Sequence, residues 1–221
     1  MPVRAVVFDL WDTIVEFVPD DAEAFHRQMA EQLDVPPDRL REVWYSEEAQ
    51  RSRNVGPIGP CLAAAIETLE VEADVEELAR WRCDHTLTSL VPRAGLLETL
   101  AALRARGIKV GLVSNCTEDV ALVWRETSFA HYFDVAIFSA TAGCAKPEPE
   151  IYRLATAGLG VDPSECLFVG DGANDELRGA ERAGLTPVLI HRHGEEPYWG
   201  DVRDWEGHRI TAIPQVLDLV R

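Results

Sequence analysis

The sequence predicts an α/β fold: a parallel sheet, covered by helices on both faces, that carries an all-helical insertion. Short, continuously apolar strand patterns alternate with helical patterns from Pro92 to His191, which is typical of a parallel sheet buried on both sides. A first strand pattern, at 4–10, has the same texture but precedes a long helical stretch. We therefore expect a sheet-containing core at 1–15 and 91–221 and a helical insertion at 16–90.

The insertion shows helical spacing and no strand pattern. Apolar side chains recur three or four positions apart in three places, at 25, 29 and 33, at 62, 65, 66 and 69, and at 75, 78 and 79. Asp20 and Asp21 could cap the first of these helices. The turn sequence NVGPIGP at 54–60 separates the first pattern from the second.

The core elements follow in strict alternation after Pro92. We expect helices at 96–107, 118–129, 148–158 and 174–184, and strands at 108–115, 133–139, 166–171 and 186–191. The polar and aromatic stretch 195–208 is expected to be a surface loop. The first strand should join the same sheet, because its apolar run resembles the other strands.

Composition excludes several classes of partner. The 221 residues include 38 acidic and 21 basic side chains, a net charge of −17, which argues against an extended basic surface for nucleic acid or anionic lipid. The five cysteines form no CxxC pair and suit reduced thiols. No apolar run approaches a membrane span, and no signal-peptide pattern precedes the first strand, so we expect a cytoplasmic protein. No feature indicates an oligomeric state.

Polar side chains stand at the carboxyl ends of the predicted strands, where ligands bind in open parallel sheets. They are Asp9, Ser114, Asn115, Lys146, Asp171 and Asp175. Carboxylates that converge on one crevice repel one another unless a hard cation such as Mg²⁺ lies among them. Lys146 and Ser114 would face an anion, and Asp9 could attack an electrophilic centre. This combination suits phosphoryl transfer to a carboxylate.

Each of these residues also has a simpler interpretation. Asp9 could be a turn residue, Ser114 a helix cap and Lys146 part of a solvated loop. Their occurrence in order at successive strand ends favours a shared site.

Four segments together resemble the haloacid dehalogenase superfamily of hydrolases: VVFDLWDT, GLVSN, HYFDVAIFSATAGCAKPEPEIY and LFVGDGANDELRGAERAGL. The resemblance implies a Rossmann-like core whose insertion is a cap that closes over the crevice and selects a small anionic, phosphorylated substrate. It implies that Asp9 is the nucleophile, and that Ser114 and Lys146 hold the transferred group. Thr13 and Asn115 join them as expected substrate-binding residues. The implied Mg²⁺ ligands are Asp9, the backbone carbonyl of Trp11, Asp171 and the nearby Asp175.

The sequence departs from the family pattern at Trp11. Family phosphatases carry there a second aspartate, which protonates the leaving group and then activates water. We consider three alternatives: a Mg²⁺-dependent phosphatase in which Asp12 or a cap residue supplies the acid/base, a metal-independent 2-haloacid dehalogenase, and a weakly active or silent protein. The dehalogenase branch has an aromatic residue, tyrosine, at the position of Trp11. In the segment that reads GDGANDE here, at 170–176, that branch has serine and asparagine. The acidic pair Asp171 and Asp175 therefore favours the metal-dependent phosphatase.

Overall fold

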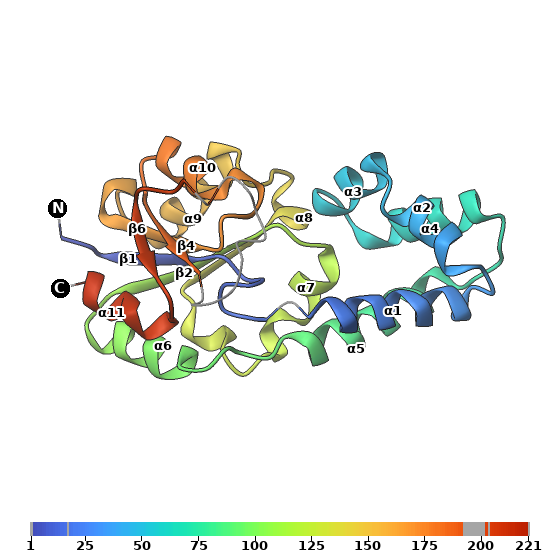
Figure 1. Cartoon of the computed structure of the whole chain (residues 1–221), viewed down its shortest axis with the longest axis horizontal. Helices are drawn as coiled ribbons and strands as arrows, with labels where there is room; N and C mark the ends of the chain where they lie inside the picture. The colour runs from blue at the N-terminus through green and yellow to red at the C-terminus, as the bar shows by residue number, and fades with distance from the viewer. Residues whose placement is uncertain (1, 17, 192–201, 203, 221) are drawn as a thin grey trace.

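The structure, a computed structural model, describes residues 2–16, 18–191, 202 and 204–220. It has two parts. Figure 1 shows a sheet flanked by helices at one end of the molecule and a block of helices at the other, with both chain termini at the sheet end.

The sheet confirms the predicted α/β class. Its six strands lie in the order β3-β2-β1-β4-β5-β6, and every neighbouring pair is parallel. Their bounds are β1 Ala5–Phe8, β2 Lys109–Ser114, β3 Val135–Phe138, β4 Cys166–Gly170, β5 Thr186–Ile190 and β6 His208–Ile210. The strand order reverses at β1, which lies between β2 and β4. Such a switch point is where α/β proteins bind ligands.

Helices cover both faces of the sheet because successive strand side chains point to opposite faces. Val6 and Phe8 of β1 join one hydrophobic cluster, with α6 (Leu96–Ala105), α7 (Glu118–Val123) and α11 (Val216–Leu219). Ala5 and Val7 join another, with α9 (Pro149–Leu159) and α10 (Glu176–Arg182). A short helix, α8 (Ser139–Ala142), follows β3. These two clusters hold the strand ends in place.

The helical block consists of α1 to α5. Their bounds are α1 Pro19–Gln32, α2 Pro37–Trp44, α3 Glu47–Asn54, α4 Ile58–Leu69 and α5 Val75–Ser89. The block has a hydrophobic cluster of its own, which includes Met29, Leu40, Leu62 and Leu78. At the start of α5 the Asp74 carboxylate accepts two backbone hydrogen bonds, of 2.9 and 3.1 Å, as an N-cap does.

The main contact between the two parts joins α5 of the helical block to α7 of the core. The first turn of α7 supplies two acidic side chains to this contact. Glu118 accepts a hydrogen bond of 2.8 Å from the backbone amide of Ile58, at the start of α4. Asp119 accepts one of 2.5 Å from the Thr86 hydroxyl of α5. Helix α7, which follows β2 in the chain, therefore also holds the helical block.

Several elements differ from the sequence prediction. The helix expected at 118–129 ends as α7 at Val123 and continues only as a 3₁₀ turn, Trp124–Glu126. Trp124 there packs edge-on against Phe129, Phe133 and Phe138. Strand β6 and helix α11 were not predicted. Part of the expected loop at 195–208 lies outside the described residues. No described helix combines the length and apolar character needed to cross a membrane.

Candidate active site

The strand ends bring three of the predicted residues together. Asp9 follows the central strand β1, and its backbone amide donates to Val169 of β4 at 2.9 Å. Ser114 ends β2, and Asp171 follows β4. Because β2 and β4 flank β1, these side chains lie on either side of Asp9. Parallel strands make this convergence a direct consequence of topology.

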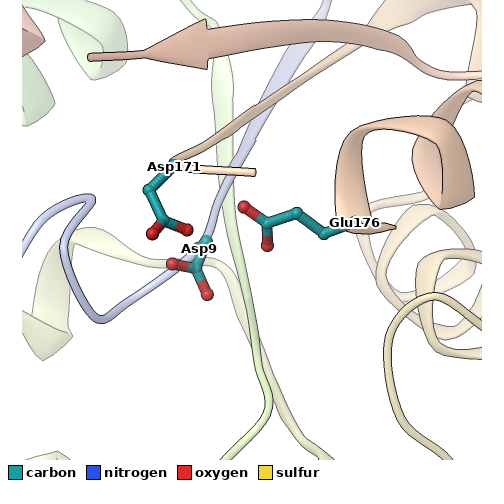
Figure 2. A group of neighbouring side chains, drawn as sticks. All are labelled: Asp9, Asp171 and Glu176. Carbon is teal, nitrogen blue, oxygen red and sulfur yellow. The ribbon is translucent and has the colours of Figure 1, made fainter. Parts of the chain in front are cut away.

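Three carboxylates form the centre of the site. One carboxylate oxygen from each of Asp9, Asp171 and Glu176 lies within 4.8 Å of the others, and Figure 2 shows the three side chains meeting from β1, the end of β4 and α10. Asp9 and Glu176 are buried, at 5% and 0% exposure. Carboxylates this close to one another raise the free energy of the folded protein unless positive charge lies among them.

Lys146 supplies part of that charge. Its Nζ donates to Asp9 and, at 2.6 Å, to Oε2 of Glu176. Burial alone would lower the pKa of Lys146, but the two carboxylates raise it above its usual value, so the ammonium stays charged. Burial raises the pKa of Glu176 well above its usual range. With all three carboxyl groups ionised, one ammonium leaves a formal excess of negative charge, and the charges of Asp9 and Asp171 add to the rise in the pKa of Glu176.

A divalent cation fits this set of donors. The three carboxylate oxygens are hard ligands of the kind Mg²⁺ prefers, and two further positive charges would balance the cluster formally. Asp9, Asp171 and Glu176 are thus the residues that could hold Mg²⁺.

Two buried hydroxyls suit an anion next to this cluster. The Oγ1 atom of Thr13 and the Oγ atom of Ser114 form no hydrogen bond with any described residue, although both residues are fully buried. An unmade buried hydrogen bond costs about 1–3 kcal/mol. Neither residue is among those that line the cavity, so the contact of these hydroxyls with a bound anion stays a prediction.

Asn115 positions Lys146. Its Nδ2 donates to the Lys146 carbonyl at 2.9 Å, and its Oδ1 accepts from the Lys146 amide at 2.8 Å. The reciprocal pair ties the loop after α8 to the end of β2. Asn115, predicted to bind substrate, therefore has its amide engaged with the backbone of another site residue.

The structure does not bring Asp175 into the cluster. Its Oδ2 accepts from both terminal nitrogens of Arg182, each at 3.1 Å. The chain has positive φ values of 55° at Asn174 and Asp175, and this tight turn directs Glu176, not Asp175, toward Asp9. Glu176, and not Asp175, therefore completes the carboxylate cluster, and the metal-ligand role of Asp175 stays a prediction that this geometry does not support.

Glu176 is the functional residue that sequence reasoning missed. Its Oε1 accepts from the Gly172 amide at 2.9 Å, and its carbonyl accepts from the Tyr152 hydroxyl at 2.8 Å. A Cβ at Gly170 would lie 2.1 Å from Glu176 Oε1, so only glycine fits there. A signal was present: Glu176 shares the buried face of α10 with Gly179 and Ala180, at helical spacing.

Trp11 and Asp12 lie beside the cluster. Both line the same cavity as Asp9, and Trp11 is partly buried against the core. Asp12 has a positive φ of 55°, and its Oδ1 accepts from Arg93 at 2.9 Å. The acid/base role of Asp12 and the metal-ligand role of the Trp11 carbonyl stay predictions.

The cavity has a volume of about 1330 Å³ and lies between the helical block and the core. Asp9, Asp171 and Lys146 line it from the core, and Phe25, Arg82 and others line it from α1 and α5. Asp9 and Asp171 of the carboxylate cluster therefore face a space that both parts of the protein enclose.

Residues 3–184 match the family model of haloacid dehalogenase-like hydrolases. The chain belongs to this family. It is therefore a hydrolase, and the resemblance noted from its motifs is confirmed.

Curated relatives in this family include several phosphatases. The chain is 32% identical to a glyceraldehyde 3-phosphate phosphatase of Methanopyrus kandleri over 62% of its length, and the match spans 60% of that relative. It is 31% identical to a phosphoglycolate phosphatase of Pseudomonas putida, with 86% and 71% of the two chains covered. With an N-acetylmuramic acid 6-phosphate phosphatase of Pseudomonas aeruginosa it shares 28%, covering 90% and 89%. The chain spans less than two thirds of the Methanopyrus relative.

Solved structures of both functional branches share the fold. A 2-haloacid dehalogenase of Pseudomonas syringae pv. Tomato superposes with a TM-score of 0.75 at 25% identity, covering 99% of this chain and 98% of that one. A family phosphatase of Thermococcus onnurineus superposes with a TM-score of 0.70 at 24% identity, covering 99% and 98%. Fold similarity alone therefore does not separate the two activities.

Proposed function

We propose that the protein is a Mg²⁺-dependent phosphatase that hydrolyses a small phosphorylated metabolite through an aspartyl phosphate on Asp9. The observation that carries this proposal is the cluster of Asp9, Asp171 and Glu176 next to Lys146. A negatively charged, buried cluster suits a metal-dependent reaction. The phosphatases among its relatives support the same substrate class.

In the first step, an oxygen of the Asp9 carboxylate attacks phosphorus. A bond forms between that oxygen and phosphorus, and the bond from phosphorus to the leaving oxygen breaks. Lys146, Ser114 and Thr13 donate hydrogen bonds to the phosphoryl oxygens, which stabilises charge in the transition state. Bound Mg²⁺, held by Asp9, Asp171 and Glu176, would supply further positive charge against the phosphoryl group.

In the second step, water attacks the aspartyl phosphate, inorganic phosphate leaves and the Asp9 carboxylate is restored. Both steps need a proton transfer that Trp11 cannot perform, since its indole is not a general acid or base at neutral pH. General acid/base catalysis contributes about 10²- to 10⁴-fold, or roughly 3 to 5 kcal/mol of barrier. Substrates with good leaving groups, such as aryl and acyl phosphates, should therefore react fastest.

The helical block, α1 to α5, is proposed to be the cap of this enzyme. It has its own hydrophobic cluster and supplies one wall of the cavity. A cap in this place would exclude water from the reacting cluster and contact the substrate's leaving group.

A 2-haloacid dehalogenase is the second candidate. It is favoured by the aromatic side chain of Trp11, since that branch carries tyrosine there, and by the similarity to the Pseudomonas syringae dehalogenase. The carboxylate cluster argues against it, because a metal-independent enzyme would gain nothing from the extra negative charge of Asp171 and Glu176.

Parallel assays of phosphate and halide release, with and without a chelator, separate the two candidates. We expect phosphate release from aryl or acyl phosphates that stops on chelation and returns with Mg²⁺. Asp9→Asn should abolish this turnover because the amide cannot act as nucleophile. Asp38→Asn, at an exposed position of α2 outside the cavity, is the matched control. Halide release that persists with chelator would establish the dehalogenase instead.

A further inference from the structure

The cavity has a second charged centre where the helical block meets the core. Arg82 of α5 and Asp119 of α7 both line the cavity and are 8% and 2% exposed. Nη2 of Arg82 lies 3.5 Å from Oδ2 of Asp119. The guanidinium group lies over the rings of Phe25 and Trp44, at 5.4 and 5.0 Å from their centroids. Aromatic rings and a carboxylate thus hold Arg82 in one place.

This pair has unused hydrogen-bonding capacity. Nε of Arg82, a donor, and Oδ1 of Asp119, an acceptor, are buried and form no hydrogen bond with any described residue. Such atoms are costly to leave without a partner, and both residues line the cavity, so a ligand bound there could supply one. A hydroxyl group both donates and accepts. Hydroxyl groups of a ligand could therefore pair with either atom.

The charged residues that line the rest of the cavity disfavour an anionic ligand. Apart from Asp9, Asp171 and Lys146, the described Asp, Glu, Lys and Arg residues that line the cavity are Asp12, Glu16, Asp21, Asp119, Arg82 and Arg93. Four carboxylates thus face two guanidinium groups. Both guanidinium groups already have a carboxylate partner, Asp119 for Arg82 and Asp12 for Arg93. A ligand carboxylate would have to compete with these partners.

We propose that the Arg82–Asp119 pair selects the substrate: the enzyme prefers phosphate monoesters whose far end is uncharged and carries hydroxyl groups, and rejects those that end in a carboxylate. This inference rests on the phosphatase activity proposed above. Arg82 and Asp119 act here on the leaving group, while Lys146, Ser114 and Thr13 hold the phosphate. A net-neutral pair with a free donor and a free acceptor suits a hydroxyl better than a second anion.

The competing interpretation is a purely structural contact. Asp119 and its neighbour Glu118 both attach α7 to the helical block, so the Arg82–Asp119 pair could serve only to hold the two parts together. A structural role would affect all substrates alike. Selectivity between substrates is therefore the readout that separates the two interpretations.

Matched substrates test the proposal on the wild-type enzyme. 2-Hydroxyethyl phosphate and phosphoglycolate differ only in a hydroxymethyl group against a carboxylate, and glycerol 3-phosphate and 3-phosphoglycerate differ in the same way. With Mg²⁺ present, we expect kcat/KM to be higher for the hydroxyl member, on the order of tenfold or more in at least one pair. Equal values in both pairs, or a preference for the carboxylate, would overturn the proposal.

A charge change tests the residues themselves. Asp119→Asn leaves the pair with one net positive charge, which favours a substrate carboxylate. We therefore expect kcat/KM of the carboxylate member to rise and the preference for the hydroxyl member to fall by about tenfold. Glu118→Gln makes the same carboxylate-to-amide change at the neighbouring residue, which also attaches α7 to the helical block but does not line the cavity, and should keep the wild-type preference. A folded Asp119→Asn protein with an unchanged preference would show that the pair does not select. If this variant does not fold, the wild-type ratio decides.

An aryl phosphate control separates failure of this inference from failure of the proposed function. Phosphate release from the aryl ester with no preference between matched substrates defeats the inference alone. No phosphate release from any substrate defeats both.

Discussion

At the residue scale, Trp11 defines what is unusual about this active site. The phosphatases among the relatives and the carboxylate cluster agree with the proposed phosphatase, yet the position two residues after Asp9, the proposed nucleophile, carries an indole. Trp11 lines the cavity and packs against the core. The nearest carboxylate in sequence, Asp12, is bound to Arg93.

Restoring an aspartate at position 11 should raise the rate with poor leaving groups. In Trp11→Asp we expect kcat with alkyl phosphates to increase by about tenfold to hundredfold, since a general acid typically contributes 10²- to 10⁴-fold. Steady-state phosphate release from an alkyl and an aryl ester measures the effect. The increase in kcat should be smaller for the aryl ester. Trp11→Phe, which keeps an aromatic ring, is the control. If alkyl ester turnover is equal in all three proteins, another residue already performs the proton transfer.

At the element scale, the turn before α10 decides which acid joins the cluster. The positions of the predicted strand ends were enough to expect Asp9 and Asp171 close together, as the structure has them, because the ends of adjacent parallel strands lie at one edge of the sheet. Glu176 could not be predicted in the same way. Its position depends on two consecutive residues with positive φ, Asn174 and Asp175, a conformation that sequence patterns indicate only weakly.

Glu176→Gln and Asp175→Asn form a matched pair for this element. We expect Glu176→Gln to weaken Mg²⁺ binding by at least about tenfold, because one of three carboxylates is lost. Asp175→Asn should change it by no more than about threefold, since it removes only a partly exposed ion pair with Arg182. Isothermal titration with Mg²⁺ measures both, and circular dichroism checks the fold. The opposite order of effects would restore Asp175 as the ligand.

Other features show what sequence patterns can and cannot predict. The alternation of helix and strand after Pro92 was enough to predict β2 to β5, because each is a continuous apolar run. Strand β6 has only three residues, two of them exposed, and carries no such run. The Arg82–Asp119 contact joins α5 to α7 through tertiary packing, which periodicity does not report.

At the scale of the whole molecule, the sheet-containing core and the helical block contribute different parts of the site. The sheet assembles the reacting groups at its switch point, and the helical block encloses them in a shared cavity. The net charge of −17 makes an anionic substrate dependent on local positive charge, which Lys146 and a bound cation would supply. The predicted cytoplasmic location and the oligomeric state stay open to experiment.

The central claim is that Asp9 becomes phosphorylated in a metal-dependent reaction. The direct measurement is acid-quenched turnover of an acyl phosphate, followed by mass mapping of peptides. Because Trp11 cannot activate water, we expect the aspartyl phosphate to accumulate. The phosphoryl group should be found on the peptide that contains Asp9, only with Mg²⁺ present, and should be absent in Asp9→Asn. Phosphate release with the phosphoryl group on another residue, or undiminished turnover in the presence of a chelator, would contradict the account.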